Sequence, residues 1–321
     1  MKESLRVLLS GVLDYAGLFP PARLPLEQAI ANFARYRQEP DAWMLGRFVC
    51  PAMKLRLLSA FHDDLFVPGP PFAFSVLGPI DPRWAECREG LIETLQRLKE
   101  FRERHPGRVI ADVLEMTLPL DLVEASAPAV TAEGLNDIHT LIESADIGDL
   151  ALFFEFGFEE GERAVATVIE AIAISNRAAL PWAGYKLRCG GPVAQSIPTA
   201  EQVAFVIRHA ISNDVALKVT AGLHHSFPRF DSSVGAKTHG FINVFAAGVL
   251  GHARHLEPDM LIDVLRDENA ANFVFDETGL SWRVFQASTS EIAAARRTGV
   301  TSFGSCSFDE PRADLRTLGW L

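Results

Sequence analysis

Lys186 and Lys218 each lie inside a short apolar segment that ends in a turn of small residues. The first segment is Gly184–Cys189, and the second is Ala216–Ala221, which Gly222 follows. Both have the length and composition of buried strands, where a lysine is costly unless a partner or a reaction uses its charge. A neutral lysine amine is also a nucleophile that forms a Schiff base with a carbonyl. The pair therefore predicts a site based on lysine chemistry.

Alternation along a strand places Arg188 on the same face as Lys186, and Thr220 on the same face as Lys218. A neighbouring cation lowers the pKa of an amine, so we take Lys218 as the candidate nucleophile and Lys186 as a catalytic neighbour. Arg188 and Thr220 are then candidate substrate-binding residues. Two alternatives remain: the three cations bind an anionic substrate without a covalent step, or they form structural ion pairs.

Two carboxylates and a histidine pair supply candidates for proton transfer. Glu115 and Glu155 lie in strand-like segments between large apolar residues, where the pKa of an inward carboxylate responds to nearby lysines. His224 and His225 follow the second lysine segment, and adjacent loop histidines diverge, so one of them faces the site. We assign Glu155 and His224 to catalysis and His225 to substrate binding.

The same side chains allow a second interpretation. Glu115, Glu155 and one of His224 and His225 would form a facial set of ligands for a divalent metal ion. No HExxH, HxH or DxD spacing supports that set, so the first interpretation has no metal and no cofactor.

Several further residues are candidates for binding the substrate. His239 and Asn243 lie at the start of a long apolar helix and either reach the ligand or only cap and bury that helix start. Gly304, Ser305 and Ser307 provide backbone amides and hydroxyls that would suit a phosphate, although small residues there could equally serve barrel packing.

From Trp43 onward the chain alternates strands and helices, which predicts an α/β fold of the (β/α)8 TIM-barrel class. Residues 1–40 are expected to form an N-terminal helical extension with an apolar loop at Asp14–Pro21, and residues 41–321 a single barrel domain. The seventh strand is ambiguous, because the residues after Phe275 also fit a hairpin. The eight predicted strands are Arg47–Cys50, Phe72–Leu77, Val109–Leu118, Ala151–Phe156, Gly184–Cys189, Ala216–Ala221, Phe273–Phe275 and Ser302–Ser307.

The composition of the chain limits the classes of molecule that the protein is expected to bind. The chain has 321 residues, 48% of them hydrophobic, and a formal net charge of −11, which argues against nucleic acid and against an anionic membrane surface. Its four cysteines form no CxxC pair, and no apolar run reaches the length of a membrane span, so we expect a cytoplasmic protein of bacterial type. The apolar N-terminal segment and Trp320-Leu321 at the end of the chain are compatible with a homodimer and equally with a monomer.

The run Lys218-Val219-Thr220-Ala221-Gly222 resembles the Lys-x-Ser/Thr-x-Gly strand of deoxyribose-phosphate-type class I aldolases. In that family the Schiff-base lysine lies on strand six, which is the predicted position of Lys218. The chain departs from the family in that its second lysine, Lys186, precedes the first, and in that Glu155 replaces a strand-four Asp. Sequence motifs such as Phe-Gly-Ser-Cys-Ser-Phe-Asp-Glu-Pro, which ends at Pro311, also resemble those of a bacterial TIM-barrel family without an assigned activity.

Together these observations predict a lyase of aldolase type that acts on a small anionic, oxygenated metabolite through an activated lysine. The first alternative is a metal-dependent hydrolase or isomerase with Glu and His ligands at the barrel mouth. The second is a non-catalytic ligand-binding barrel, because a fold by itself does not select a reaction.

Overall fold

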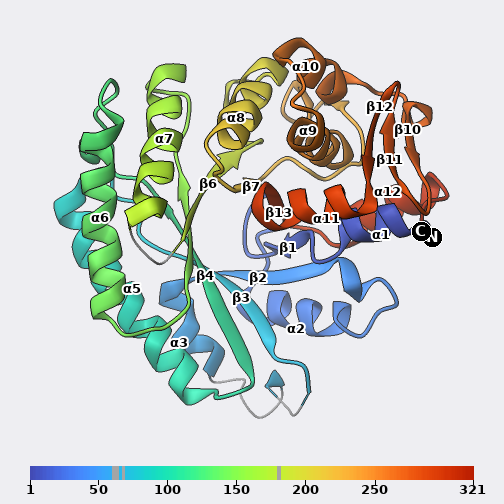
Figure 1. Cartoon of the computed structure of the whole chain (residues 1–321). Coiled ribbons are helices and arrows are strands. Elements are labelled where there is room, and N and C mark those ends of the chain that lie inside the picture. The colour runs from blue at the N-terminus through green and yellow to red at the C-terminus, as the bar shows by residue number, and fades with distance from the viewer. Residues whose placement is uncertain (60–64, 67–68, 179–181) are drawn as a thin grey trace. The chain divides into compact units, whose positions relative to one another are not determined.

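The computed structural model describes residues 1–59, 65–66, 69–178 and 182–321 (Figure 1). Eight strands form a closed barrel in the order β1-β13-β7-β6-β5-β4-β3-β2, so the predicted TIM-barrel fold is confirmed. No helix in these ranges is long and apolar enough to cross a membrane. The barrel strands are β1 (Leu13–Tyr15), β2 (Leu45–Pro51), β3 (Phe72–Leu77), β4 (Val109–Thr117), β5 (Ala151–Glu155), β6 (Ala183–Arg188), β7 (Leu217–Thr220) and β13 (Val300–Ser305).

The predicted strand list is wrong at one position and incomplete at another. Phe273–Phe275 is not a barrel strand; it is β10, which pairs antiparallel with β11 (Gly279–Trp282) in a separate sheet completed by β12 (Phe285–Ser288). The reason is the turn that follows, where Asp276 Oδ1 accepts hydrogen bonds from the backbone amides of Thr278 and Gly279 and reverses the chain. The eighth barrel strand is instead β1, which lies inside the predicted N-terminal extension.

The chain forms two compact units. Unit 1 contains residues 1–14, 40–46 and 187–321, and unit 2 contains residues 15–39 and 47–186. The boundary crosses β6, so that Lys186 belongs to unit 2 and Arg188 to unit 1.

Unit 2 packs its helices over a core rich in phenylalanine. Phe33 on α2 lies 5.5 Å from Phe48 on β2 between ring centroids, Phe48 lies 6.0 Å from Phe74, and Phe74 lies 5.2 Å from Phe101 on α5. All four rings are buried, and their tilted and edge-to-face geometries are those that aromatic pairs prefer. Figure 1 shows α6 and α7 side by side. The helices of this unit are α2 (Leu26–Tyr36), α3 (Leu55–Leu58), α5 (Trp84–Arg104), α6 (Pro128–Ser144) and α7 (Glu162–Ala178).

Unit 1 is built around α9, whose residues from Phe241 to Gly251 are all buried. An all-round apolar helix requires neighbours on every side, and α8, α10, α11 and β13 supply them. The sequence also fixes helix starts: Thr199 and Gln202 form a reciprocal capping box at α8. A hairpin of β8 (Arg229–Asp231) and β9 (Ala236–Thr238) lies between β7 and α9. The helices of this unit are α1 (Glu3–Leu9), α8 (Ala200–Ser212), α9 (Phe241–Arg254), α10 (Pro258–Arg266), α11 (Thr289–Thr298) and α12 (Asp309–Thr317).

Candidate active site

Strand register brings three charged side chains of unit 2 onto one face of β4, β5 and β6. Glu155 pairs in register with Lys186 on β6 and with Thr117 on β4. Glu115 lies two residues before Thr117, and side chains two apart on a strand share a face. Glu115, Glu155 and Lys186 therefore project in the same direction from three consecutive strands.

These side chains form one hydrogen-bonded cluster, which we call the Lys186 centre. Lys186 Nζ lies 2.8 Å from Glu115 Oε2 and 2.8 Å from Glu155 Oε2, and the Ser75 hydroxyl donates to the other oxygen of Glu115. The exposed fraction of the side chain is 2% for Glu115, 9% for Lys186 and 19% for Glu155. Exposure thus increases from Glu115 to Glu155, and Glu155 is the carboxylate that a molecule from solvent would meet first.

The charge state of Lys186 follows from this geometry. Burial by itself would lower its pKa, but the two adjacent carboxylates favour the ammonium more strongly, so the pKa of Lys186 is raised. The sequence predicted cations around the lysines, whereas the described partners of Lys186 are anions. Lys186 is therefore an ammonium at neutral pH.

Because β1 is a barrel strand, each of the first six predicted strands moves up by one in the count. Lys186 lies on the sixth barrel strand and Lys218 on the seventh, not on the fifth and sixth as predicted. Glu115 lies on the fourth strand and Glu155 on the fifth. Lys218 and Glu155 therefore do not lie on the sixth and fourth strands, where the resemblance to class I aldolases placed them.

Lys218 lies in a second buried cluster, which belongs to unit 1 and which we call the Lys218 centre. Its ammonium donates to Asp14 Oδ2, and Ser302 Oγ donates to the same oxygen at 2.8 Å. The side chains of Lys218 and Asp14 are 2% and 0% exposed. Lys218 is thus a buried ion-paired cation, in agreement with the structural alternative of the sequence analysis.

The sequence reasoning missed Asp14 as a partner and placed it in a loop. The sequence feature that could have revealed it is a single acid in the apolar run Val12-Leu13-Asp14-Tyr15, a pattern that is also typical of a buried strand. The strand β1 is only three residues long, which is why periodicity did not reveal it. Ser302 and Ser75 were missed because buried hydroxyl groups are common in strands and carry no distinctive spacing.

The histidine pair contacts α12. His224 Nδ1 lies 2.9 Å from Glu310 Oε2, and His225 Nδ1 lies 3.6 Å from Asp314 Oδ1, one helical turn further along. Burial is the main cause that lowers the pKa of His225, and Arg229 adds to it. Both histidines are partly exposed, and Glu310 holds His224 through a hydrogen bond, whereas His225 Nδ1 lies beyond hydrogen-bond distance of Asp314.

The turns after β6 and β7 pack backbone against backbone. A Cβ added to Gly190 would lie 2.6 Å from the Cα of Gly222, and Gly222 has a φ of +72°, which favours glycine. Thr220 lies beside Gly304 on β13, with its backbone oxygen accepting from the Cys189 amide at 2.7 Å. Arg188, the other predicted contact, is exposed.

The remaining predicted binding residues have structural partners within unit 1. Asn243 donates to the backbone oxygens of Val264 and Asp267, each at 2.7 Å. Ser305 Oγ donates to the Ser307 carbonyl at 2.8 Å, and Ser307 Oγ accepts from the Glu310 amide at the start of α12. His239 Nε2 lies 2.7 Å from the Pro198 carbonyl oxygen. These contacts fix loops and helix ends.

No group of three or more His, Cys, Asp and Glu side chains is arranged to hold a metal ion within the ranges that the structure describes. Glu115 and Glu155 both bind the Lys186 ammonium, and His224 and His225 face carboxylates of α12. The metal-dependent alternative therefore has no donor set among the described residues. The four cysteines are free and buried.

Neither a protein-family model nor a curated protein matches the chain. Among solved structures, the chain is similar to a tetrameric deoxyribose phosphate aldolase from Aeropyrum pernix, with a TM-score of 0.51 and 12% sequence identity. The match covers 99% of this chain and 98% of that chain. At this identity the likeness shows a shared fold.

Proposed function

We propose that the protein is a lyase of aldolase type that acts on a small anionic, oxygenated metabolite, with Lys186 as the reacting amine. The observation that carries the proposal is the position of Lys186 Nζ, 2.8 Å from two carboxylates of which one, Glu155, is partly exposed. An isolated structural pair needs one carboxylate. A second, more accessible one provides a proton acceptor beside the amine.

Lys186 replaces Lys218 as the proposed nucleophile for two reasons. The Lys218 ammonium is 2% exposed and bound to a fully buried carboxylate, so a carbonyl carbon has no free path to it. Lys186 is more exposed and lies on the sixth strand, where the resemblance to class I aldolases expects the Schiff-base lysine. We assign Lys218 to supporting the barrel interior.

The proposed chemistry begins with transfer of a proton from the Lys186 ammonium to Glu155, which leaves a neutral amine. The amine adds to the substrate carbonyl, and protonated Glu155 gives its proton to the departing hydroxyl, so that water leaves and an iminium ion forms. The Glu155 carboxylate then takes the proton of the substrate β-hydroxyl while the bond between the α and β carbons breaks, which releases a carbonyl product and leaves an enamine on Lys186. Glu155 protonates the α carbon of the enamine, and water hydrolyses the resulting iminium ion to release the second product and restore the Lys186 ammonium. Glu115 is buried, contacts Lys186 Nζ at 2.8 Å and accepts from Ser75, and so holds Lys186 in position.

For the substrate anion we propose Arg188, which follows Lys186 by two residues on β6 and is exposed. A guanidinium group binds carboxylate or phosphate with two parallel hydrogen bonds. No cofactor takes part in the proposed reaction.

Borohydride trapping with a panel of small aldehydes and ketones tests the proposal. Reduction of an imine leaves a stable adduct, which intact-protein and peptide mass spectrometry assign to one residue. We expect one adduct at Lys186, its loss in Lys186→Met, and its retention in the matched variant Lys218→Met where that variant folds. An adduct at Lys218, or equal labelling of an exposed lysine such as Lys2, would contradict the proposal.

Assembly is a separate proposal. The aldolase of similar fold is described as tetrameric, and unit 1 exposes Val284 and Phe230 by 84% and 65%. We propose that the chain associates with copies of itself, which is one of the two states that the sequence allows. Light scattering during size-exclusion chromatography would give the mass directly, and a mass of 35.2 kDa at all concentrations would contradict it.

A further inference from the structure

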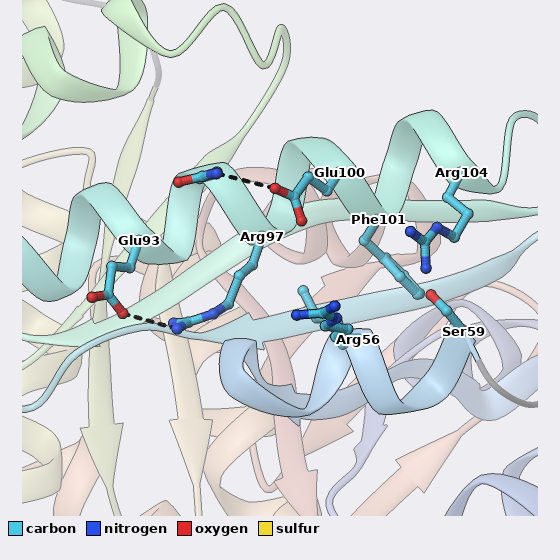
Figure 2. Close-up of a pocket in the computed structure, with 9 residues that line it drawn as sticks. Arg56, Ser59, Glu93, Arg97, Glu100, Phe101 and Arg104 are labelled. Carbon is cyan, nitrogen blue, oxygen red and sulfur yellow. Dashed lines mark hydrogen bonds and ion pairs between the residues drawn. The ribbon is translucent and has the colours of Figure 1, made fainter.

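A hollow of about 460 Å³ lies in unit 2 between α3 and α5. Its lining includes the side chains of Arg56, Arg97 and Arg104, the hydroxyl-bearing Ser59, and Phe101. Figure 2 shows the guanidinium groups of the three arginines projecting into the space between the two helices. Glu93 and Glu100 also line the hollow, so its three arginines and two glutamates give a formal charge of +1 in a protein whose net charge is −11.

The acidic residues of the hollow are engaged by other side chains. Glu93 Oε2 accepts from Arg97 at 2.8 Å, and Glu100 Oε1 accepts from the amide of Gln96 at 3.1 Å. Arg56 and Arg104 have no hydrogen bond or ion pair with any residue in the ranges that the structure describes. Among the residues that the structure describes, none therefore occupies the donors of these two guanidinium groups.

Ser59 adds a neutral polar group beside these cations. Its Oγ lies 3.0 Å from Nε2 of His105, a fully buried ring that contacts Phe101 at 5.1 Å between centroids. The buried imidazole fixes the position of the hydroxyl, while Leu55 and Phe101 form an apolar base. Fixed donors around an apolar base are typical of a small-molecule site.

We propose that this hollow binds a small phosphorylated metabolite, with Arg56 and Arg104 holding the phosphate and Ser59 donating to it. Guanidinium forks match the oxygens of phosphate, and two of them with a hydroxyl suit three oxygens better than the two of a carboxylate. A volume of about 460 Å³ holds a nucleoside monophosphate or a compact sugar phosphate. The site is formed by helices outside the strands that carry Lys186, so the proposal does not depend on the proposed lyase activity.

Isothermal titration calorimetry at about 0.05 M salt tests the site with four probes: inorganic phosphate, pyrophosphate, a nucleoside monophosphate and, for comparison, succinate. We expect at least one phosphorylated probe to bind at one site per chain, more tightly than succinate. Arg104→Gln and Arg56→Gln should each weaken it roughly ten- to a hundred-fold, the range for one charge-assisted contact. Ser59→Ala should weaken it by less.

Matched controls separate the site from general charge effects. Arg88→Gln changes the same charge on an exposed position of α5 that does not line the hollow, and should leave binding unchanged. Lys186→Met should also bind normally, so failure of the lyase proposal would leave this one testable. The proposal is overturned if no phosphorylated probe binds, if succinate binds as tightly, or if Arg88→Gln weakens binding as much as Arg104→Gln.

Discussion

The buried lysines of the barrel differ in the burial of the carboxylates that contact them. Lys186 contacts Glu115 and the partly exposed Glu155, and Lys218 contacts Asp14, which is fully buried. A buried ammonium with a buried carboxylate stabilises a fold only while both partners remain, whereas an ammonium between two carboxylates can pass a proton to one and keep the other. This difference is the physical basis for assigning reaction to Lys186 and support to Lys218.

The first expectation at the residue scale concerns pH. The raised pKa of Lys186 keeps its amine protonated, so trapping should accelerate as pH increases from about 7 to about 10, by up to about tenfold per unit. Glu115→Gln removes one anion and should lower the pKa of Lys186, which moves the profile toward lower pH. Labelling rates across this range provide the measurement.

The exposed variant Glu103→Gln on α5 serves as the control for that profile, since it removes an equal charge away from Lys186. Two results would show that the carboxylates do not set the protonation of the reacting amine. One is a trapping rate that does not change with pH, and the other is a shift of the rate profile to higher pH in Glu115→Gln.

The second expectation concerns the Lys218 centre. Asp14→Ala leaves a buried ammonium without its carboxylate, so the free energy of unfolding should fall by about 3–5 kcal/mol. Urea unfolding measures the loss. Adding Lys218→Met to Asp14→Ala should recover much of it, because the uncompensated charge is removed. Asp263→Ala, which breaks a pair with both side chains about half exposed, should cost no more than about 1 kcal/mol. Equal losses of unfolding free energy in Asp14→Ala and Asp263→Ala would contradict the view that Asp14 neutralises a buried ammonium.

At the element scale, α12 fixes the loop that follows β7. Asp314 Oδ2 accepts from the Ser226 amide at 2.7 Å, and its other oxygen faces His225. Glu310, one turn earlier, faces His224. One helix thus orders the loop whose histidines were predicted to act on substrate.

We expect Asp314→Ala to increase hydrogen exchange of the Ser226 amide and its neighbours, because that amide loses its acceptor. The effect should be local, with the amides of β13 unchanged. Thr317→Ala on the same helix, whose hydroxyl donates to the Ala313 carbonyl, should leave the loop as protected as in the wild type. Unchanged exchange at Ser226 in Asp314→Ala would mean that other contacts hold the loop.

At the scale of the whole molecule, buried titratable groups limit stability on both sides of neutral pH. Burial lowers the pKa of His139 and His239, so the unfolded chain binds protons that the folded chain does not. Stability should therefore fall as pH drops below the ordinary histidine value of 6.5, by at most about 1.4 kcal/mol per unit for each proton. For Lys186 the folded pKa is raised, so its contribution is complete below its ordinary value of 10.5 and is lost as pH rises through the folded pKa.

Urea unfolding at several pH values between about 5 and about 7 measures the acid side. His239→Gln keeps a donor for the Pro198 carbonyl and removes the titration, so its unfolding free energy should depend less steeply on pH than that of the wild type. Equal slopes for the two proteins would show that His239 does not contribute to acid destabilisation.

The sequence by itself determined the class of fold and seven of the eight barrel strands, because continuous apolar runs separated by amphipathic helices are a local pattern. It also identified Lys186, Lys218, Glu115 and Glu155, since a charge inside an apolar strand is visible without coordinates.

Only the tertiary structure decided which segments close the barrel and which charges meet. The strand β1 is too short to show a period, and it becomes a strand because the barrel supplies pairing partners on both sides. The carboxylate of Asp14 is 204 positions from Lys218 in the sequence, and no local rule links them. Strand register, set by pairing across the sheet, placed Lys186 between two acids, and it is this arrangement that directs the proposed chemistry to Lys186.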